Sequence, residues 1–462
     1  MTARARGMAP GGPAGPGWPT VAVLCLGVWL HAADSLLAAT VMPSAVAEIG
    51  GLAFIYWTVA LYQLGSIVAA AVTGILALRL GLGAAMTVAA LIYAAGCAIS
   101  ALAPDMGAML LGRLLQGWGG GWMVALSHVG VTQLFAPARW PHLLAVISAV
   151  WGVSALLGPL IGGAFATAGL WRGGFWAFAL QALALAATMP LLLRRAQGST
   201  RVAEPVPGGR ILVLCAGVVA VLMAGVQSTW PRAMLLVALG LGLLAAALSM
   251  ERRRNQLFPP GPLDPRRPWG QGYLMILALS TATVSFTVYG PLLMEMLFGV
   301  TPLVAGFMIA VESVSWTLAA IVCAGAGPRL EPALIFGGAL IISLGIAGLA
   351  WTMPQGPVVA LLPWAVLLGA GFGMAWAFVM RRVVESVPPG ERERAASSLP
   401  TIQLLGYALG AAASGIVANL AGLAAGAPRA VVESAAFWVF AAFLPLAALG
   451  SAAAWRLSRT SA

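Results

Sequence analysis

The 462-residue sequence is 61% hydrophobic and only 8% charged, with a formal net charge of +11. Soluble proteins average about 25% charged residues, so too few charges remain here to cover a soluble domain of this length. All the basic residues are arginine, and they lie in short clusters between apolar stretches. This pattern argues against a basic surface for nucleic acid and is typical of membrane topology.

The apolar stretches are each about as long as the twenty residues that a helix needs to cross a bilayer. In chain order, the first six lie near 18–43, 52–77, 81–103, 107–134, 141–167 and 173–193. Two more lie near 210–229 and 232–250, and a second six near 270–297, 301–325, 332–352, 357–380, 395–422 and 433–455. The first stretch is too long and too polar for a signal peptide, so we interpret it as a retained helix. About fourteen transmembrane helices are predicted.

The arginines orient these spans. If the N-terminus is cytoplasmic, only Arg172, Arg232 and Arg429 fall in outer segments, and Arg113 lies within a span. Cytoplasmic segments of membrane proteins carry such an excess of basic residues, and adding or removing one span would invert the pattern beyond it. We therefore expect a multi-pass protein of the cell inner membrane with both termini in the cytoplasm.

The spans divide the chain into five regions. We expect a cytoplasmic tail at 1–17, a six-helix half at 18–193, a segment of cytoplasmic loops with two extra helices at 194–269, a second six-helix half at 270–455, and a cytoplasmic tail at 456–462. No polar segment is long enough for a soluble domain, which disfavours a membrane sensor or scaffold.

Several motifs resemble the major facilitator superfamily, and within it the fourteen-span drug/proton antiporter family. They are DSLLAATVMP from Asp34 to Pro43, Trp57 with Tyr62 and Leu64, GRLLQGWGGG around Arg113, GPLIGG from Gly158 to Gly163, and WRGGFW from Trp171 to Trp176. The resemblance implies an all-α membrane fold, in which two six-helix halves enclose a midplane cavity and two extra helices lie between them. It also implies that Gly158, Pro159, Gly162 and Gly163 form the antiporter motif of the fifth helix.

The loop between the second and third spans departs from the family pattern. GILALRLGLG keeps Gly74, Arg79 and Gly81, but Leu78 stands where the family has an acid. Leu82 and Gly83 replace a basic pair. Because this charge cluster locks the inward gate in the family, its loss here leaves the gating mechanism open.

Ionisable side chains at membrane depth are costly, so each is a candidate functional group. Asp34 and Arg113 lie at similar depths in the first and fourth spans, and we expect them to pair. A structural ion pair is the alternative to a proton-coupling one. His31 precedes Asp34 by three residues on the same helix face and either relays protons to it or bonds a neighbouring helix.

Other candidates lie elsewhere in the membrane. Glu312, close to the midplane of its span, either carries a proton or pairs with a cationic substrate, or else is a protonated side chain bonded to a neighbour; Glu295 lies nearer the outer end. Trp118, Trp122 and Trp151 either line a substrate cavity or face lipid.

No nucleotide-binding, hydrolase or metal-binding signature is present, and the four cysteines show no CxxC spacing. We therefore predict neither an enzyme nor a cofactor or metal site. The leading hypothesis is proton-coupled antiport that exports a lipophilic or cationic small molecule. The alternative is a carrier on the same fold for a specific metabolite, such as a vitamin or a sugar-like compound.

Overall fold

The computed structural model describes residues 17–136, 139–192, 208–227, 229–250 and 258–459, and within them not the side chains of 71–72, 74–79, 141, 230 and 393. The described chain is helical throughout. The first group of helices is α1 (Trp18–Ile49), α2 (Ile55–Leu80), α3 (Leu82–Leu102), α4 (Met106–Leu134), α5 (Trp140–Thr167) and α6 (Trp171–Leu192). Two central helices follow, α7 (Gly208–Ala224) and α8 (Trp230–Ser249).

The second group contains α9 (Pro268–Phe298), α10 (Pro302–Cys323), α11 (Glu331–Thr352), α12 (Leu362–Ser386), α13 (Arg392–Leu420), α14 (Arg429–Ala441) and α15 (Leu444–Arg459). Short 3-10 turns precede three helices: η1 (Leu52–Phe54), η4 (Val358–Leu361) and η5 (Pro389–Glu391). The last span is the one that differs from expectation, since it is broken between α14 and α15. Pro445 has no N–H to donate to the carbonyl of Ala441, which interrupts the helix there.

Local signals fix where several helices begin. Asp105 caps α4, because its side chain accepts a hydrogen bond from the Ala108 N–H, and Thr301 caps α10 through the Val304 N–H. Proline in the first turn starts α1, α5, α8, α9, α10, α11 and α12, where its missing N–H leaves no bond unmade. Gly81, between α2 and α3, has φ of 76°, a left-handed conformation that a side chain would strain.

Within the described residues, twelve spans are long and apolar enough to cross a membrane. Two further helices complete the bundle. The 17-residue α7 is apolar but short, and the 29-residue α4 is made more polar by Arg113, Gln116 and its glycines. With α14 and α15 counted as the single span Arg429–Arg459, the described residues give the fourteen spans expected.

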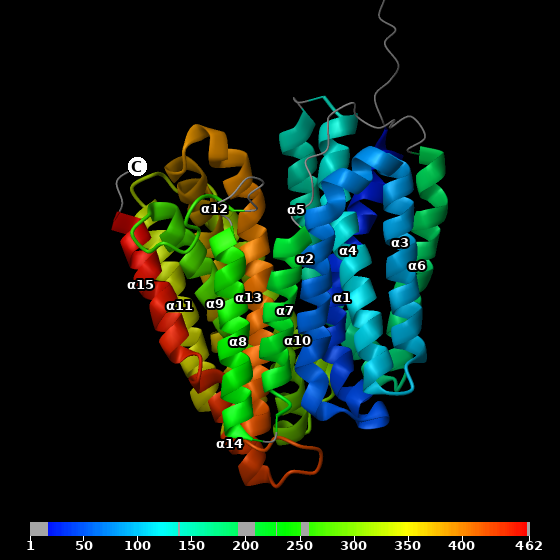
Figure 1. Ribbon diagram of the computed structural model, residues 1–462. Coiled ribbons are helices and arrows are strands. Elements are labelled where there is room, and N and C mark those ends of the chain that lie inside the picture. The colour runs from blue at the N-terminus through cyan, green and yellow to red at the C-terminus, as the bar shows by residue number, and fades with distance from the viewer. Residues whose placement is uncertain (1–16, 137–138, 193–207, 228, 251–257, 460–462) are drawn as a thin grey trace, which may run out of the picture.

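The helices form two groups that meet along two flanks. Helix α2 packs against α13 on one flank and α5 against α10 on the other, while α1 touches α9 and α10. We call the end that holds the start of α1 and the end of α15 the termini end, and the opposite one the far end. The ribbons of the two groups lie farther apart at the termini end (Figure 1).

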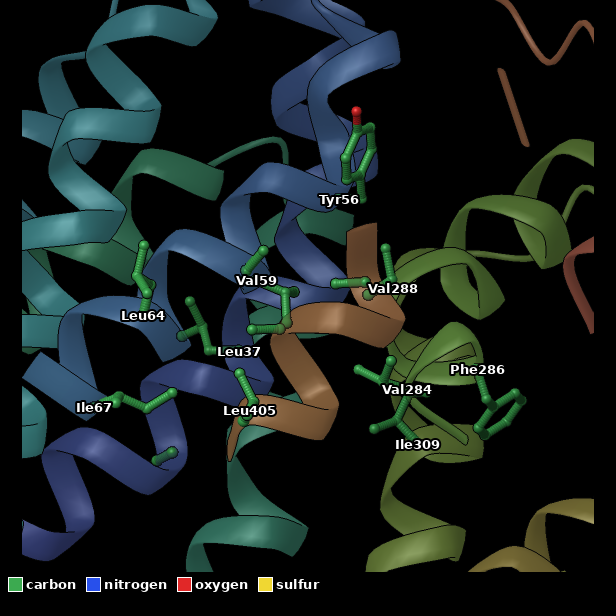
Figure 2. Packing of buried hydrophobic residues seen from close by; sticks show 14 of the residues in the cluster. Leu37, Tyr56, Val59, Leu64, Ile67, Val284, Phe286, Val288, Ile309 and Leu405 are labelled. Carbon is green, nitrogen blue, oxygen red and sulfur yellow. The ribbon is translucent and has the colours of Figure 1, made fainter. Parts of the chain in front are cut away.

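The inserted helices α7 and α8 pack against each other, and α7 also contacts α13 and α2. They lie across the junction between the groups in Figure 1. Buried apolar side chains from both groups form one continuous cluster, among them Leu37 and Val59 from the first and Val288 and Leu405 from the second (Figure 2). The two groups are therefore joined by packed side chains as well as by loops.

Candidate functional site

A buried ion pair lies inside the first helical group. Arg113 of α4 donates from Nη1 to Oδ2 of Asp34 on α1 at 3.0 Å, and neither side chain is more than 1% exposed. The structure thus brings together the two residues whose depths in the sequence suggested a pair. Their part in proton coupling stays a prediction.

The guanidinium of Arg113 has further partners. Nη1 also donates to Gln116 Oε1 at 2.9 Å, and Nε donates to the Thr58 carbonyl at 3.4 Å. The other carboxylate oxygen of Asp34, Oδ1, is buried without a hydrogen-bond partner in the described part of the chain. A proton could therefore settle on Asp34 while Arg113 keeps hydrogen bonds to neutral groups, which lowers the cost of separating the pair.

Tyr62 of α2 connects this pair to His31. The Arg113 guanidinium lies over the Tyr62 ring, 4.3 Å from its centroid, a cation–π contact. The Tyr62 hydroxyl donates to the His31 carbonyl at 2.7 Å and lies 2.9 Å from His31 Nδ1. The imidazole stacks near the same ring, with centroids 5.1 Å apart. Tyr62 therefore contacts both candidate proton-carrying regions.

Trp151 of α5 lies on the open side of His31. Its ring meets the imidazole edge to face, with centroids 5.9 Å apart, and the side chain is 40% exposed. Next to it, Gly152 faces Thr317 of α10, at ordinary van der Waals distance from any added Cβ. Trp151 therefore contacts the buried histidine while part of its ring stays exposed, on a helix that packs against α10 of the second group.

The other two tryptophans are placed differently. Trp122 is 3% exposed inside the first group, and its Nε1 has no hydrogen-bond partner among the described residues. Trp118 is 39% exposed. It follows Arg113 by five residues, or about 140° around the helix, so it lies on a different face of α4. The structure does not bring Trp118 and Trp122 together with the ion pair as one aromatic wall.

Glu312 lies in the second group, separate from the Asp34–Arg113 pair. Its backbone packs tightly against Gly369 of α12, which leaves no room for a side chain at that position. The residue is half-buried, and the Tyr407 hydroxyl on α13, to which Gln403 donates at 3.2 Å, lies within electrostatic range of its carboxyl. Glu312 is thus a carboxyl group with polar neighbours near the junction.

Glu295 lies near the far end of α9. Its Oε1 is buried and lacks a hydrogen-bond partner in the described residues. The residue as a whole is half-buried, near the outer end of its span as the sequence indicated.

The glycine motif of α5 packs against both neighbours of that helix. A Cβ at Gly158 would meet the Ala33 carbonyl of α1 at 2.6 Å, and one at Gly162 would meet Leu37 and Thr40 of the same helix. A Cβ at Gly163 would lie 2.7 Å from Cα of Leu303 in α10.

Pro159 completes the contact of this motif with its neighbours. Its carbonyl accepts from Thr40 Oγ1 at 3.2 Å and faces Gly306 of α10. The motif thus lets α5 approach α1 and α10 backbone to backbone.

The side chains of the motif between α2 and α3 fall partly outside the described residues. Nothing is described for Gly74, Leu78 or Arg79 beyond their place in α2, while Gly81 forms the turn. A charge cluster does exist at the termini end of the second group. Glu331, which is 4% exposed, pairs with Arg381 and Arg382 of α12.

The sequence analysis did not single out Tyr62 and Gln116 as site residues, or Glu331 as part of a charge cluster. The sequence offered a signal for the first two, since both belong to the quoted motifs, but not for their contacts. No group of three or more His, Cys, Asp or Glu side chains that could hold a metal occurs in the described residues.

Comparison with known proteins identifies relatives along nearly the whole chain. The model of the Major Facilitator Superfamily matches residues 24–411. A probable multidrug-efflux transporter of Mycobacterium tuberculosis is 30% identical over 453 residues, which cover 95% of this chain and 94% of that protein. A puromycin resistance protein of Streptomyces alboniger is 31% identical over 327 residues, covering 67% of this chain and 63% of that protein.

Solved transporters have the same fold. The inward open conformation of the xylose transporter of E. coli aligns with a TM-score of 0.64 over 96% of both chains, at 16% identity. A crystal structure of a peptide transporter aligns with a TM-score of 0.67, at 17% identity, over 96% of this chain and 95% of that one. The fold predicted from the sequence is confirmed: an all-α membrane bundle of two six-helix halves with two extra central helices.

Proposed function

Since this chain belongs to the major facilitator superfamily and is a membrane transporter, we propose that it exports lipophilic or cationic small molecules in exchange for protons. The observation that carries the proposal is the buried Asp34–Arg113 pair with its free oxygen Oδ1. The relative from Mycobacterium tuberculosis, described as a probable multidrug-efflux transporter, supports the direction and the substrate class.

Proton coupling needs a group that changes charge during the cycle and a route to it. Asp34 supplies the carboxylate, and Arg113 is its partner in the ion pair. His31 and Tyr62 lie between this pair and the exposed Trp151. A proton moving from the junction would therefore pass His31 before it reaches Asp34, whose protonation releases Arg113 to Gln116 and to the Thr58 carbonyl.

Substrate would bind at the junction of the halves. Trp151 offers an exposed aromatic face, and Thr317 of α10 lies beside its neighbour Gly152. Glu312 lies five residues from Thr317, about 7.5 Å along α10 and about 140° around it, so the two side chains lie on different faces of that helix. An aromatic ring for stacking and a carboxyl group for charge match a flat lipophilic cation.

We further propose that the far end faces the outside of the cell and the termini end the cytoplasm. The arginines Arg172, Arg232 and Arg429 start α6, α8 and α14 at the far end, and the other described arginines outside the bundle core lie toward the termini end. The positive-inside rule supports this orientation in the inner membrane. In this orientation the halves, 18–193 and 270–455, would rock about the cavity between them, with the segment 194–269 inserted.

Proton movement in inverted membrane vesicles tests the proposal. A pH-sensitive dye follows the lumen while lipophilic cations, antibiotics and vitamins are added one by one. We expect a substrate-triggered proton efflux in the wild type that is lost in Asp34→Asn. The control is Asp105→Asn, the same change at an exposed helix cap, which should behave as the wild type.

Two outcomes would contradict the proposal. Undiminished uphill export by Asp34→Asn would remove this residue from coupling. Accumulation of a vitamin or sugar-like compound by intact cells, in place of exclusion, would favour the alternative of a metabolite carrier.

A further inference from the structure

The C-terminus of α7 is held by side chains from both halves. The Tyr56 hydroxyl, at the start of α2, donates to the Leu222 carbonyl at 2.9 Å. Asn419, near the end of α13, donates from Nδ2 to the Gly225 carbonyl at 2.8 Å and to the Ala53 carbonyl of η1 at 3.0 Å. Three parts of the chain that are far apart in sequence are thus tied at the far end.

The bonds meet a need of α7 itself. The last carbonyls of a helix have no partner within it, and at the edge of a bilayer an unpaired carbonyl is costly. Leu222 and Gly225 stand at this end of α7, and the donors that reach them are side chains of α2 and α13. The backbone N–H groups of Gly225 and Gln227 also reach the last turn of α7, at Leu222 and Ala224. The end of the inserted helix is therefore completed partly by its own loop and partly by the two halves.

Steric fit also holds the Tyr56 ring between α7 and α13. Tyr56 is fully buried, and a Cβ at Gly415 of α13 would overlap its ring. A Cβ at Gly225 would lie 2.9 Å from Cζ of the same ring. Figure 2 shows the Tyr56 hydroxyl pointing away from Leu37 and Val59, out of the apolar cluster. The ring occupies a slot that exists only while α2, α7 and α13 are together.

We propose that the contacts among the start of α2, the end of α13 and the end of α7 form a latch that keeps the far end closed. In this proposal the inserted pair α7–α8 moves with the second half. Asn419 and Gly225 stay together in this scheme, because α7 lies along α13. At the termini end, Leu214 of α7 and Leu405 of α13 line one small apolar pocket. Opening of the far end separates α2 from α13 and breaks the bonds of Tyr56 to Leu222 and of Asn419 to Ala53.

The latch does not depend on which substrate or ion is transported. It requires only that the halves part at the far end during the cycle, as alternating access demands. It gives the two additional helices a role in the conformational equilibrium, beyond filling space.

Thiol labelling measures that equilibrium. In a chain whose Cys25, Cys97, Cys215 and Cys323 are replaced by alanine, Thr40→Cys is the reporter, because Thr40 is fully buried beside Pro159 at the far end. A membrane-impermeant maleimide added from the outside reacts with it only when the halves part. Labelling is read in cells, on protein that reaches the membrane in wild-type amounts.

Two variants weaken the latch without changing its shape. Tyr56→Phe keeps the ring and removes one hydrogen bond, and Asn419→Leu keeps about the same side-chain size, stays uncharged and has no N–H to donate. We expect each to speed labelling about fivefold, the effect of one net hydrogen bond. The matched control is Tyr273→Phe, whose buried hydroxyl donates to the Ala395 carbonyl within the second half, and it should leave the rate unchanged. Equal rates in the latch variants and the control would overturn the proposal.

Distances between spin labels test whether the pair α7–α8 moves with the second half. Labels at Arg232 on the far end of α8, at Leu170 between α5 and α6, and at Ala425 between α13 and α14 are all on exposed residues. When substrate or a lowered outside pH increases the population that is open at the far end, the distribution of distances between labels at residues 232 and 170 should gain a longer component. The distance from 232 to 425 should not change. A change in the second distance alone would show that the inserted pair moves with the first half, contrary to the proposal.

Discussion

Arg113 and Asp34 form an ion pair in which only one carboxylate oxygen is used. The guanidinium bonds Oδ2, while Oδ1 is buried without a partner in the described chain. In the proposed antiport, this oxygen is the site at which Asp34 takes up a proton.

Removing the charges of Asp34 and Arg113 should show whether the pair serves protein stability or proton coupling. Asp34→Asn leaves the Arg113 charge buried without its counterion, which typically costs about 3–5 kcal/mol. The double variant Asp34→Asn with Arg113→Gln removes both charges, so we expect it to regain most of the lost thermal stability in detergent but no uphill transport. Recovery of uphill transport in the double variant would mean that the pair is structural only.

Tyr62→Phe should impair coupling more than binding. The change keeps the ring under Arg113 and beside His31 but removes the hydroxyl that contacts the histidine. We expect substrate-triggered proton efflux to fall about tenfold, while the affinity for a fluorescent substrate stays within about twofold. The matched control is Tyr273→Phe, and a tenfold loss of affinity in Tyr62→Phe would instead place Tyr62 in the substrate site.

Glu312→Gln should discriminate between cationic and neutral substrates. Loss of a carboxylate that faces a bound cation is expected to weaken binding about tenfold, or about 1.4 kcal/mol, with no effect on neutral compounds. Affinities are measured by fluorescence titration of the purified protein. Glu433→Gln serves as control, since Glu433 pairs with Arg429 on the surface of α14. An equal loss for neutral and cationic compounds would show that the residue acts through the protein and not on charge.

Glycine positions in α5 should differ sharply in their tolerance to alanine. At Gly163 the added Cβ would overlap the backbone of Leu303, so Gly163→Ala should hinder closure of the far end and slow transport at least tenfold. At Gly152 the nearest atom, of Thr317, lies 3.4 Å away, and Gly152→Ala should be nearly neutral. Transport assays at equal expression compare the two, and similar activities would argue against close α5–α10 contact.

The charge clamp of the second half should contribute to stability rather than to transport. Glu331 bonds Arg382 Nε at 2.6 Å and also pairs with Arg381, and it is almost fully buried. Glu331→Gln is therefore expected to lower the melting temperature clearly. Glu391→Gln, at a partly exposed pair with Arg394 that is worth at most about 1 kcal/mol, should have little effect. Equal shifts in the two variants would contradict this difference.

Much of the fold could be predicted because the thickness of the bilayer sets the length of each apolar stretch. Apolar length and arginine placement marked every helix of the bundle, and similar depths of Asp34 and Arg113 indicated their pairing. The break before Pro445 was missed, since a proline inside a long apolar stretch either bends or interrupts a helix depending on what packs there.

The contacts made by side chains far apart in sequence could not be predicted. That Trp151 rather than Trp118 meets His31 depends on how α5 is rotated against α1. Helix rotation is set by interhelical packing and not by hydropathy. The same holds for Tyr56, whose importance emerges only when α7 lies beside α2 and α13.

The inserted helices also affect how a compound in the bilayer reaches the junction between the two halves. Because α7 contacts both α2 and α13, the inserted pair covers that flank of the junction. The opposite flank, formed by α5 and α10, presents exposed apolar side chains such as Val153 and Phe307. Among the described residues, one flank of the junction is thus covered by an added helix pair and the other presents its seam directly to the lipid, so the two lipid-facing sides of the transporter differ.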